Sequence, residues 1–496
     1  MKSSSHRSRS LLRVLVAGAS VLVAELAVIG SAFGEVVTWP LAPGTVATDG
    51  VWRVTVNGRA LDVLNVPRPT HCLTGSFAQP YYAAFFDADE TVEIAVSGHD
   101  PENARKIRIL PERRNIRPTP NKDGTVVFRA RPPFNLVLQR GSRYHNLVLA
   151  AQTPEKDRPR ADDPNVVFFG PGRHRLDKPL KLGARQTLYL APGAYVEGAV
   201  RGVGNDITVC GRGILSGEPW PWVKGPQGRM CWLSGTNVTV RGVTLMSSWT
   251  WTLVLDRAEN VLIDGVKILN GRVLNDDGID LCSVRNATVR GCFVRAQDDC
   301  VAVKWKSENL LVEDCAFWTD VANIIRIGYE CAGSGHAFRH QVFKKIDVIR
   351  QAVGNNKPPD HYWTENTIAI QMSHDTLAED LLFEDFAFDG VEPQDLFLCL
   401  RTPICRYRGI DIRHGGHVRN VRFRKIRFPA KRPLGSLGIW MHSVDPEHAV
   451  EDVSFEDCEC FTVPVAMRGD VRDVRGLPTQ AYRCFPHVER NDEISR

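Results

Sequence analysis

Two near-copies of one acidic motif lie in the middle of the chain and hold the residues best suited to chemistry. The first is Asn-Asp-Asp-Gly-Ile-Asp-Leu at residues 275–281, and the second is Gln-Asp-Asp-Cys-Val-Ala-Val at residues 297–303. Each joins an amide and two carboxylates to a small residue and an alternating apolar run. Because like charges at short range resist simultaneous ionisation, four aspartates are rarely grouped in this way for structure alone.

The offset between the motifs, 22 residues from Asp276 to Asp298, matches the period of the repeat around them. We therefore expect Asp276 beside Asp298, and Asp277 beside Asp299, on adjacent coils. Facing carboxylates suit glycoside hydrolysis, in which a protonated acid donates to the leaving oxygen and an ionised carboxylate activates water or attacks carbon. Mutual repulsion would raise one pKa and keep a proton available near neutral pH.

Two other interpretations of the aspartates stay open. An acidic cluster on a β-solenoid can bind Ca²⁺, which prefers several oxygen ligands. Asn or Asp at a solenoid turn can also cap the turn through local hydrogen bonds, a role that we expect for Asn237, Asn260 and Asn286. A cap needs one carboxylate rather than two, so it explains the paired aspartates less well.

A short repeat surrounds the acidic motifs and must position them. An Asn or Asp, replaced once by His340, precedes an alternating apolar strand, a turn and a second apolar strand. Eight copies, at intervals of 23, 26, 23, 31, 40, 40 and 32 residues, end at Val243, Val266, Cys292, Cys315, Ile346, Phe386, Ile426 and Cys458. Such coils of three short strands predict an all-β fold, a right-handed parallel β-helix with coils about 4.8 Å apart. The longer late intervals indicate inserted loops.

The N-terminal part of the chain has a different pattern. Residues 1–34 have the features of a signal peptide, and Glu25 within the apolar stretch argues against a retained membrane anchor. Residues 35–152 hold alternating strands between Pro and Gly turns, which predicts a small β-sandwich. A polar linker at 153–164 leads to the β-helix at 165–496. The sandwich could bind glycan, but we favour a cap on the open end of the helix.

Composition argues against several classes of partner. The chain has 62 basic and 57 acidic residues, and residues 1–34 hold four of the basic and one of the acidic, so the remainder has 58 and 56. This balance predicts no affinity for nucleic acid. No later segment has the ~20 apolar residues of a membrane span. We expect a secreted or periplasmic monomer without membrane contact after cleavage of the signal.

The thirteen cysteines form no CxxC pair, which argues against a zinc site. Cys292, Cys315 and Cys458 occupy equivalent repeat positions, which favours small apolar residues that stack between coils. Disulfides elsewhere stay possible.

The motifs resemble those of the pectin-lyase-like β-helix glycosidases, namely glycoside hydrolase family 28 and its relative, family 49. The family 28 pattern of Asn-Thr-Asp-Gly-Ile-Asp, then Gln-Asp-Asp-Cys one coil later, is matched at 275–280 and 297–300, with Asp276 in place of Thr. Family 49 also carries an N-terminal β-sandwich. Its entry coils are similar to residues 167–172, 188–196 and 211–217. The resemblance covers roughly residues 165–460.

This resemblance implies roles for the acidic residues. Asp298 would be the general acid, Asp277 and Asp299 would position and activate water, and the reaction would invert the anomeric configuration. The coil spacing alone leaves retention and inversion both open. Around these groups we expect the substrate to contact Asn275, Asp276, Gln297, Lys304, Asn323, Arg326 and Gln371.

Two departures from family 28 bear on the substrate. Its Gly-His-Gly is matched by Ala-Asn-Ile at 322–324, and its Arg-Ile-Lys by Ala-Ile-Gln at 369–371. Without those cations a galacturonate carboxylate would be unpaired, which predicts a neutral or differently charged sugar. Arg326, Lys304 and Lys306 lie near the motif and could replace the missing cations.

Aromatic side chains should provide surfaces on which sugar rings stack. Trp249 and Trp251 lie one coil before the first acidic motif, and Tyr362 and Trp363 lie in an inserted loop. Of these we favour Trp249, Tyr362 and Trp363 as contacts to the substrate.

These features predict a secreted glycoside hydrolase that cleaves a poly- or oligosaccharide other than plain polygalacturonate, with no cofactor and no bound metal. One alternative is a Ca²⁺-dependent polysaccharide lyase or epimerase on the same fold, with Lys304 or Arg326 as the base. The other is a carbohydrate-binding solenoid without turnover. The clustering of aspartates on two adjacent coils argues against that non-catalytic alternative.

Overall fold

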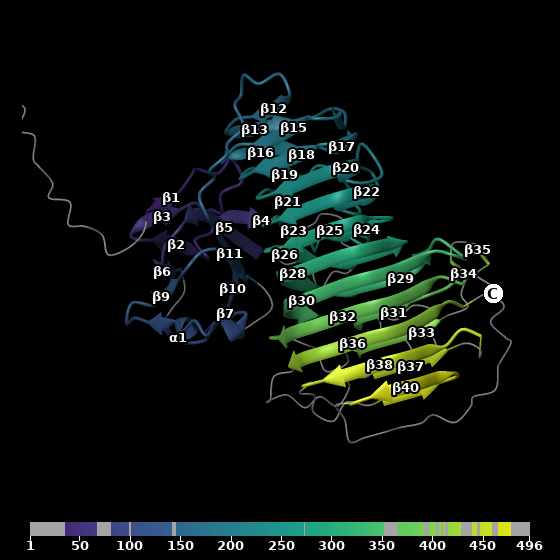
Figure 1. The fold of residues 1–496 in the computed structure, drawn as a ribbon. Helices are drawn as coiled ribbons and strands as arrows, with labels where there is room; N and C mark the ends of the chain where they lie inside the picture. Colours follow the sequence, from purple (N-terminus) through teal and green to yellow (C-terminus); the bar gives the residue numbers. More distant parts are fainter. Residues whose placement is uncertain are drawn as a thin grey trace, which may run out of the picture.

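The computed structural model describes two β-rich units that lie side by side (Figure 1). The described residues are 35–66, 81–98, 101–140, 145–271, 273–351, 366–390, 396–402, 406–407, 410–411, 415–427, 439–443, 447–458 and 465–477. The predicted signal peptide, and Tyr362 and Trp363 of the expected aromatic loop, lie outside these ranges. Within them, no helix has both the length and the apolar character needed to cross a bilayer.

The N-terminal unit is a β-sandwich. Its elements are β1 (Val36–Val37), β2 (Arg53–Val56), β3 (Arg59–Leu61), β4 (Leu64–Val66), β5 (Tyr81–Ala88), β6 (Val92–Ser97), α1 (Pro101–Ala104), β7 (Ile107–Leu110), η1 (Glu112–Arg114), β8 (Thr119–Pro120), β9 (Val126–Ala130), β10 (Phe134–Arg140) and β11 (Leu147–Gln152). One sheet has the order β1-β5-β11-β10-β7, with β4 beside β5, and the other has the order β3-β2-β6-β9-β8. Alternating residues point between the sheets, as Val92, Ile94 and Val96 of β6 do.

The second unit is a right-handed parallel β-helix built from one 27-stranded sheet, which confirms the predicted fold class. Its early strands are β12 (Val166–Phe169), β13 (Gly172–Arg175), β14 (Leu180–Leu182), β15 (Thr187–Leu190), β16 (Ala194–Glu197), β17 (Val200–Val203), β18 (Thr208–Gly211), β19 (Ile214–Ser216), β20 (Cys231–Arg241), β21 (Thr244–Met246), β22 (Leu253–Asp264) and β23 (Lys267–Leu269).

The later strands of the same sheet carry the acidic motifs and the coils after them. They are β24 (Ile279–Cys282), β25 (Arg285–Arg290), β26 (Phe293–Ala296), β27 (Val301–Trp305), β28 (Ser307–Thr319), β29 (Ile325–Cys331), β30 (Ala337–Gln351), β31 (Asn366–Gln371), β32 (Leu377–Phe388), β33 (Leu396–Thr402), β36 (His417–Arg427), β37 (Ile439–Ser443), β38 (Val450–Glu456), β39 (Val465–Arg468) and β40 (Val471–Arg475). A separate pair, β34 (Arg406–Tyr407) and β35 (Ile410–Asp411), lies outside it.

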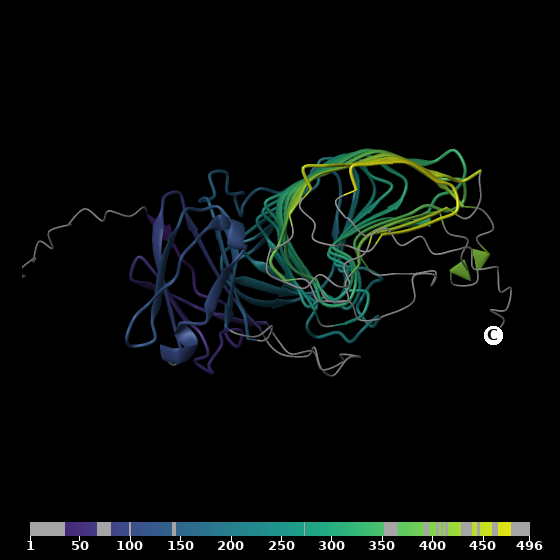
Figure 2. The same ribbon diagram turned by 90° about the horizontal axis from the view of Figure 1, so that it is seen from below.

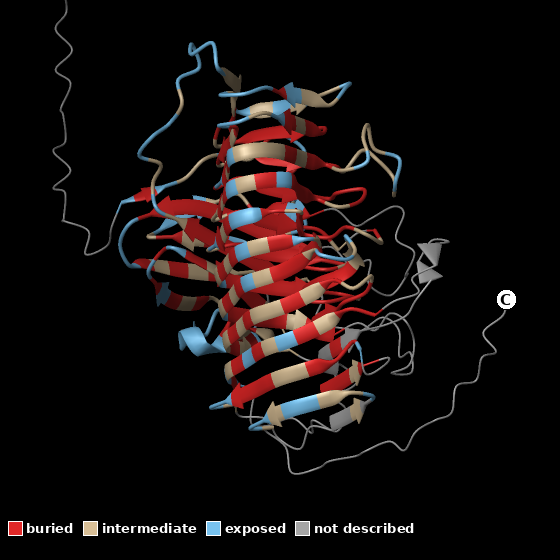
Figure 3. Ribbon diagram, turned by 45° about the vertical axis from the view of Figure 1, so that its right-hand side comes forward, coloured by how far each residue is buried: buried red, intermediate tan, exposed pale blue. Residues whose placement is uncertain are grey.

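Each coil presents three faces. In the coil of the first motif, β24 lies on the first face, β25 on the second and β26 on the third, and the chain returns to the first face at β27. Viewed from below, the stacked coils enclose one elongated interior (Figure 2). Inward residues of the first face, such as Ile279, Val301 and Ile325, are fully buried there, and Figure 3 shows buried residues on every central coil.

The observed strand register reproduces the repeat intervals read from the sequence. Successive partners on the second face are Val240, Ile263, Val289, Val312, Phe343, Phe383, Phe423 and Phe455. The four phenylalanines form an interior stack with ring centroids 5.0, 5.1 and 4.9 Å apart. Burying such a stack favours a single register, because a shift by one residue would turn every apolar side chain outward.

An asparagine ladder runs along the turn between the first and second faces. Asn237, Asn260, Asn286 and Asn309 all have φ between 55° and 60°, a left-handed conformation that asparagine tolerates better than most residues. Each amide of the last three donates to the side-chain oxygen of the asparagine on the previous coil, at 3.2, 3.2 and 3.0 Å. The first three asparagines lie at turns, as expected, but these hydrogen bonds join neighbouring coils, and a local capping role stays a prediction.

The sandwich lies along the flank of the helix and not over its end, so the expected capping position is wrong. Outward residues of the third face, including Met246, Phe293 and Trp318, share one apolar cluster with Phe85 and Val148 of the sandwich. These third-face residues are apolar on their outward side because the sandwich covers them.

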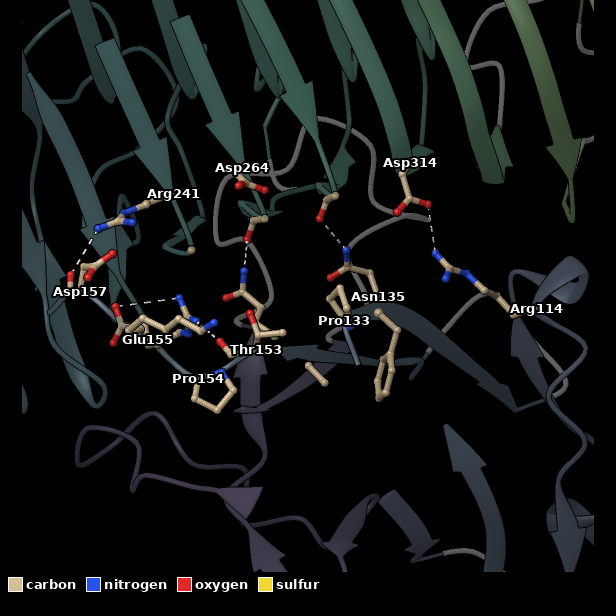
Figure 4. A pocket seen from close by; sticks show the side chains of 18 residues that line it. Arg114, Pro133, Asn135, Thr153, Pro154, Glu155, Asp157, Arg241, Asp264 and Asp314 are labelled. Carbon is tan, nitrogen blue, oxygen red and sulfur yellow. Dashed lines mark hydrogen bonds and ion pairs between the residues drawn. The ribbon is translucent and has the colours of Figure 1, made fainter. Parts of the chain in front are cut away.

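Charged groups reinforce this junction. Arg212 of the helix forms a largely buried ion pair of 2.9 Å with Asp87 of the sandwich. A cleft of about 350 Å³ also lies between the two units (Figure 4). Its polar groups pair across the junction, as when the Asn135 and Gln152 amides donate to the carbonyls of Gly291 and Gly265 at 3.0 and 2.9 Å. The cleft contains neither acidic motif, and we assign it a structural role.

Among the cysteines whose side chains the structure describes, Cys292, Cys315 and Cys458 form no disulfide. Cys292 and Cys315 are buried in the interior of neighbouring coils, as their repeat positions predict, whereas Cys458 is only half-buried.

Candidate active site

The strand register brings the two acidic motifs together. Ile279 of β24 pairs with Val301 of β27, and the Gly278 N–H donates to the Asp299 carbonyl at 2.8 Å. Asp277 and Asp299 therefore occupy equivalent positions on adjacent coils, just before each strand enters the first face. The predicted side-by-side stacking of the motifs is confirmed.

Three carboxyl groups converge at this turn. One oxygen from each of Asp277, Asp298 and Asp299 lies within 4.8 Å of the other two. Asp277 and Asp299 are each 3% exposed, whereas Asp298 is partly exposed. Of the three carboxyl groups, that of Asp298 is therefore the most accessible to solvent.

Cations contact two of the three aspartates. Lys304 Nζ lies 3.0 Å from Asp277 Oδ2, and Arg326 Nε lies 2.8 Å from Asp299 Oδ2. The Asn323 amide also donates to Asp299 Oδ1 at 2.5 Å. Asp298 has no ion-pair partner in the part of the chain that the structure describes, and it accepts instead from neutral donors, the Asn275 N–H and amide at 3.2 and 3.3 Å.

This arrangement separates the protonation states of the aspartates. Burial raises the pKa of Asp298 well above its usual value, and the negative charges of Asp277 and Asp299 raise it further. Burial also raises the pKa of Asp277, but the Lys304 ammonium opposes that rise. The proton of the group therefore belongs on Asp298, while Lys304 and Arg326 stabilise negative charge on its neighbours.

Lys304 is the centre of a wider buried network. Its ammonium also lies 2.9 Å from Asp280 Oδ1 and 3.9 Å from Glu330 Oε1. Burial alone would lower the pKa of Lys304, but Asp277 and Asp280 outweigh it, so the pKa lies well above the usual value. Asp280 and Glu330 were absent from the predicted site. The alternation of Ile279, Asp280 and Leu281 is a signal for Asp280, because it places that carboxylate on the outward side of the strand.

Asp276 does not reach the outward surface, in contrast to the prediction that it contacts substrate. It is 0% exposed, and its carboxylate accepts the N–H groups of Gly271, Gln297 and Asp298 at 2.9, 2.6 and 3.2 Å. A carboxylate in this position fixes the backbone of both acidic turns.

We predict that Asp276→Asn lowers the free energy of unfolding by about 3 kcal/mol, since the amide turns an N–H toward backbone donors and an unmade buried hydrogen bond costs about 1–3 kcal/mol. Chemical denaturation would measure this change. Asp264→Asn, which removes a solvent-exposed partner of Arg290, is the matched control and should cost less than about 1 kcal/mol. Equal effects of the two substitutions would contradict the structural role of Asp276.

Several other predicted contact residues are buried near the carboxylates, where they contact the site's own side chains. Asn323 and Gln371 are fully buried, and the Gln371 oxygen accepts from Arg326 at 3.3 Å. Gln297 is 1% exposed, and its amide atoms have no hydrogen-bond partner among the described residues. Among the described members of this set, Asn275 alone is partly exposed, as Asp298 is.

The choice of Trp249 as a sugar platform is wrong, because that side chain belongs to the interior. It is 0% exposed, packs edge-on against Trp220 at 5.4 Å, and donates to the Gln227 carbonyl. Trp251 is the partly exposed tryptophan beside the site, with Lys304 Nζ 3.3 Å and Arg229 Cζ 3.7 Å from its ring centroid.

The same oxygens could in principle ligate a cation, because carboxylates are typical Ca²⁺ ligands. Two of them already contact Lys304 and Arg326. The expected absence of a metal stays a prediction.

Comparison with known proteins finds similarity to glycoside hydrolases. The sequence profile described as "Glycosyl hydrolases family 28" matches residues 226–320, which include both motifs. An isopullulanase from Aspergillus niger is 25% identical over 301 residues, which cover 55% of this chain and 48% of that protein. A polygalacturonase from Chamaecyparis obtusa is 37% identical over 79 residues, which cover 16% of this chain and 15% of that protein. The chain thus spans about half the length of the first relative and less of the second.

Among solved structures, Dex49A from Penicillium minioluteum aligns with a TM-score of 0.60 at 15% identity, over 87% of this chain and 92% of that chain. This likeness shows a shared fold that includes most of both chains. Together with the profile match, it confirms the resemblance to family 28 and family 49 proteins that the motifs predicted.

Proposed function

We propose that this chain is a secreted glycoside hydrolase that cleaves O-glycosidic bonds of a neutral poly- or oligosaccharide. One observation carries the proposal: three carboxyl groups meet within 4.8 Å, and the described cations contact Asp277 and Asp299 but not Asp298. A protonated acid beside ionised carboxylates is the pair of groups that glycoside hydrolysis needs. Similarity to family 28 and to an isopullulanase supports the same reaction.

In the proposed reaction, Asp298 donates its proton to the glycosidic oxygen as the bond from that oxygen to the anomeric carbon breaks. A water molecule held by Asp277 and Asp299 attacks the anomeric carbon and loses a proton to one of them. The proton given up by Asp298 is later restored from solvent, which its partial exposure permits. Lys304 forms an ion pair with Asp277, and Arg326 forms one with Asp299, so each acceptor has a cation beside it.

We propose inversion of the anomeric configuration on the strength of the family 28 motifs. The carboxylate oxygens are closer than the roughly 6.5–9.5 Å usual for inverting pairs, so the separation by itself favours retention through a covalent intermediate. Proton NMR of the first product formed distinguishes the two outcomes directly. The opposite anomer supports direct attack by water, and the same anomer would assign a nucleophilic role to Asp277 or Asp299.

The cations near the site argue against a galacturonate substrate. Lys304 and Arg326 are both buried and already paired with the site's own carboxylates, so neither is free to bind a substrate carboxylate. Lys306 is exposed, but it follows the far end of β27, which is roughly 16 Å of strand away from the acidic turn. Neutral glucans therefore fit the site better than polygalacturonate.

The lyase or epimerase alternative fares poorly in this geometry. It needs Lys304 or Arg326 as a base, yet nearby carboxylates outweigh burial and raise the pKa of both groups. A lysine or arginine held in its charged form cannot accept a proton.

The proposal is tested by hydrolysis of a polysaccharide panel that includes dextran, pullulan and polygalacturonate. We expect new reducing ends from at least one neutral glucan, without the ultraviolet absorbance of an unsaturated lyase product. Brisk cleavage of polygalacturonate would overturn the assignment of a neutral substrate, and ultraviolet-absorbing products would overturn hydrolysis itself.

We also predict a bell-shaped dependence of kcat/KM on pH. The rate should fall as pH rises through the pKa of Asp298, because the acid loses its proton. It should also fall at low pH as Asp277 is protonated, and because burial raises the pKa of Asp277, this limb lies above the ordinary aspartate range. A rate that stays constant up to the ionisation of lysines would contradict Asp298 as the acid.

A further inference from the structure

A chain of hydrogen bonds connects the sandwich to both acidic turns. The Tyr81 hydroxyl, at the start of β5, donates to the Asn270 carbonyl at 2.8 Å. The Asn270 amide donates to the Asp276 carbonyl at 3.0 Å, and the Asp276 carboxylate accepts the Gln297 and Asp298 N–H groups. Three consecutive links therefore separate a sandwich side chain from the backbone of the proposed general acid.

Asn270 is the branching point of this chain. Its side-chain oxygen accepts the Ser248 N–H at 3.1 Å, and its amide also donates to Thr252 Oγ1 at 2.6 Å. These two partners flank Trp251 on the preceding coil. Asn270 is 2% exposed, so its bonds are shielded from water, and they tie its own turn to the turn of the preceding coil.

A buried ion pair between Arg295 and Asp320 packs against the ring of Tyr81. The Arg295 guanidinium lies 3.9 Å from the Tyr81 ring centroid and 4.4 Å from that of Trp318. Arg295 forms an ion pair of 3.2 Å with Asp320, and the Trp318 indole donates to the same carboxylate at 2.8 Å. Burial raises the pKa of the Tyr81 phenol, so its hydroxyl keeps the proton that it donates at neutral pH.

We infer that Tyr81 is a positioning residue, through which the N-terminal sandwich sets the geometry of the acidic turns. The sandwich then completes the site mechanically, without touching the sugar. This role differs from both a cap on the solenoid and a separate glycan-binding unit. The kinetic part of its test rests on the proposed hydrolase function, and the structural part does not.

The test compares Tyr81→Phe with Tyr82→Phe in the full chain. Each change removes one hydroxyl from a buried tyrosine of β5 and keeps the ring, but the Tyr82 hydroxyl donates to Asp49 within the sandwich. We expect Tyr81→Phe to lower kcat about tenfold with little change in KM, since sub-ångström displacement of reacting groups is costly. Tyr82→Phe should leave kcat within about twofold of the wild type.

Hydrogen–deuterium exchange supplies a readout that needs no activity. Peptides that contain residues 270–278 and 296–300 should exchange about tenfold faster in Tyr81→Phe and at the wild-type rate in Tyr82→Phe. Unchanged exchange in Tyr81→Phe, or equal acceleration in both variants, would overturn the inference. If the wild type proves to have no hydrolase activity, the proposed function fails and this exchange comparison still decides the role of Tyr81.

A second variant tests the same hydrogen-bonded link from the side of the solenoid. Asn270→Ser breaks the chain on the solenoid side and also removes the bonds to Ser248 and Thr252, so its effect on exchange and kcat should be at least that of Tyr81→Phe. Because Tyr81 acts only through Asn270 in this link, the double variant should be little worse than Asn270→Ser alone. Additive losses would show two independent effects and would contradict the proposed link.

Discussion

Asp298→Asn should lower kcat by about 10²- to 10⁴-fold, the usual contribution of a general acid. The substitution keeps the size of the side chain and an oxygen that can accept from Asn275. Its amide cannot deliver a proton to the leaving oxygen. Initial rates on the neutral glucan that the wild type cleaves best would measure the loss.

Stability measured alongside separates a catalytic effect from a structural one. Asparagine resembles the protonated aspartic acid that the site favours, so thermal unfolding should be unchanged or shifted slightly upward. The alkaline limb of the pH profile should disappear in the residual activity. A wild-type rate would remove Asp298 from the mechanism, and a collapse of the melting temperature would point to a structural role.

Lys304→Met should be the most damaging single change around the site. Removing one partner of a buried ion pair typically costs about 3–5 kcal/mol, and here Asp277 and Asp280 both lose their cation. Because Lys304 lowers the pKa of Asp277, its loss lets that pKa rise, so the acid limb of the pH profile should move to higher pH. Urea unfolding and the pH dependence of kcat/KM measure the two effects.

Lys306→Met is the matched control for Lys304→Met. It removes the same charge two residues along the chain, at an exposed position, and should change stability by less than about 1 kcal/mol. Lys304→Arg should recover part of the stability of Lys304→Met, since it restores the charge. An acid limb that does not move in Lys304→Met would mean that the ammonium does not control Asp277.

The meeting of the carboxylates was predictable because two regularities in the sequence agree. Strands alternate with period two, and the motifs are offset by 22 residues, so Asp277 and Asp299 had to share a position on adjacent coils. The same logic gave the intervals of the whole repeat. Along one face of the sheet, the apolar alternation of each copy indicates which residues pair with the next copy.

The burial of side chains in the turns was less predictable, because the turns have no repeating pattern of buried and exposed residues. Trp249 and Trp251 are two residues apart in a loop, and which of them enters the interior depends on contact with Trp220 from another loop. Asp276 and Asp277 are adjacent and identical in type, yet one binds backbone N–H groups and the other faces Asp298. Local sequence does not encode such long-range contacts.

The sequence of the third face carries a signal for the position of the sandwich. Strands β21, β23 and β26 of the third face are buried on both sides, whereas β25 on the second face alternates between buried and open residues. A strand with large apolar residues at outward positions, such as Met246 and Phe293, must be covered by something. The flank was therefore the position for the sandwich that this pattern favoured.

The asparagine ladder has a consequence for how such a molecule can change over time. Each rung offers its neighbours the same amide and the same oxygen, so a rung copied by tandem duplication would find ready-made partners above and below. The solenoid could thus gain whole coils beyond the two that carry the acidic motifs while the residues of the candidate site stay together. The number of coils can therefore change during evolution without a change in the residues of the candidate site.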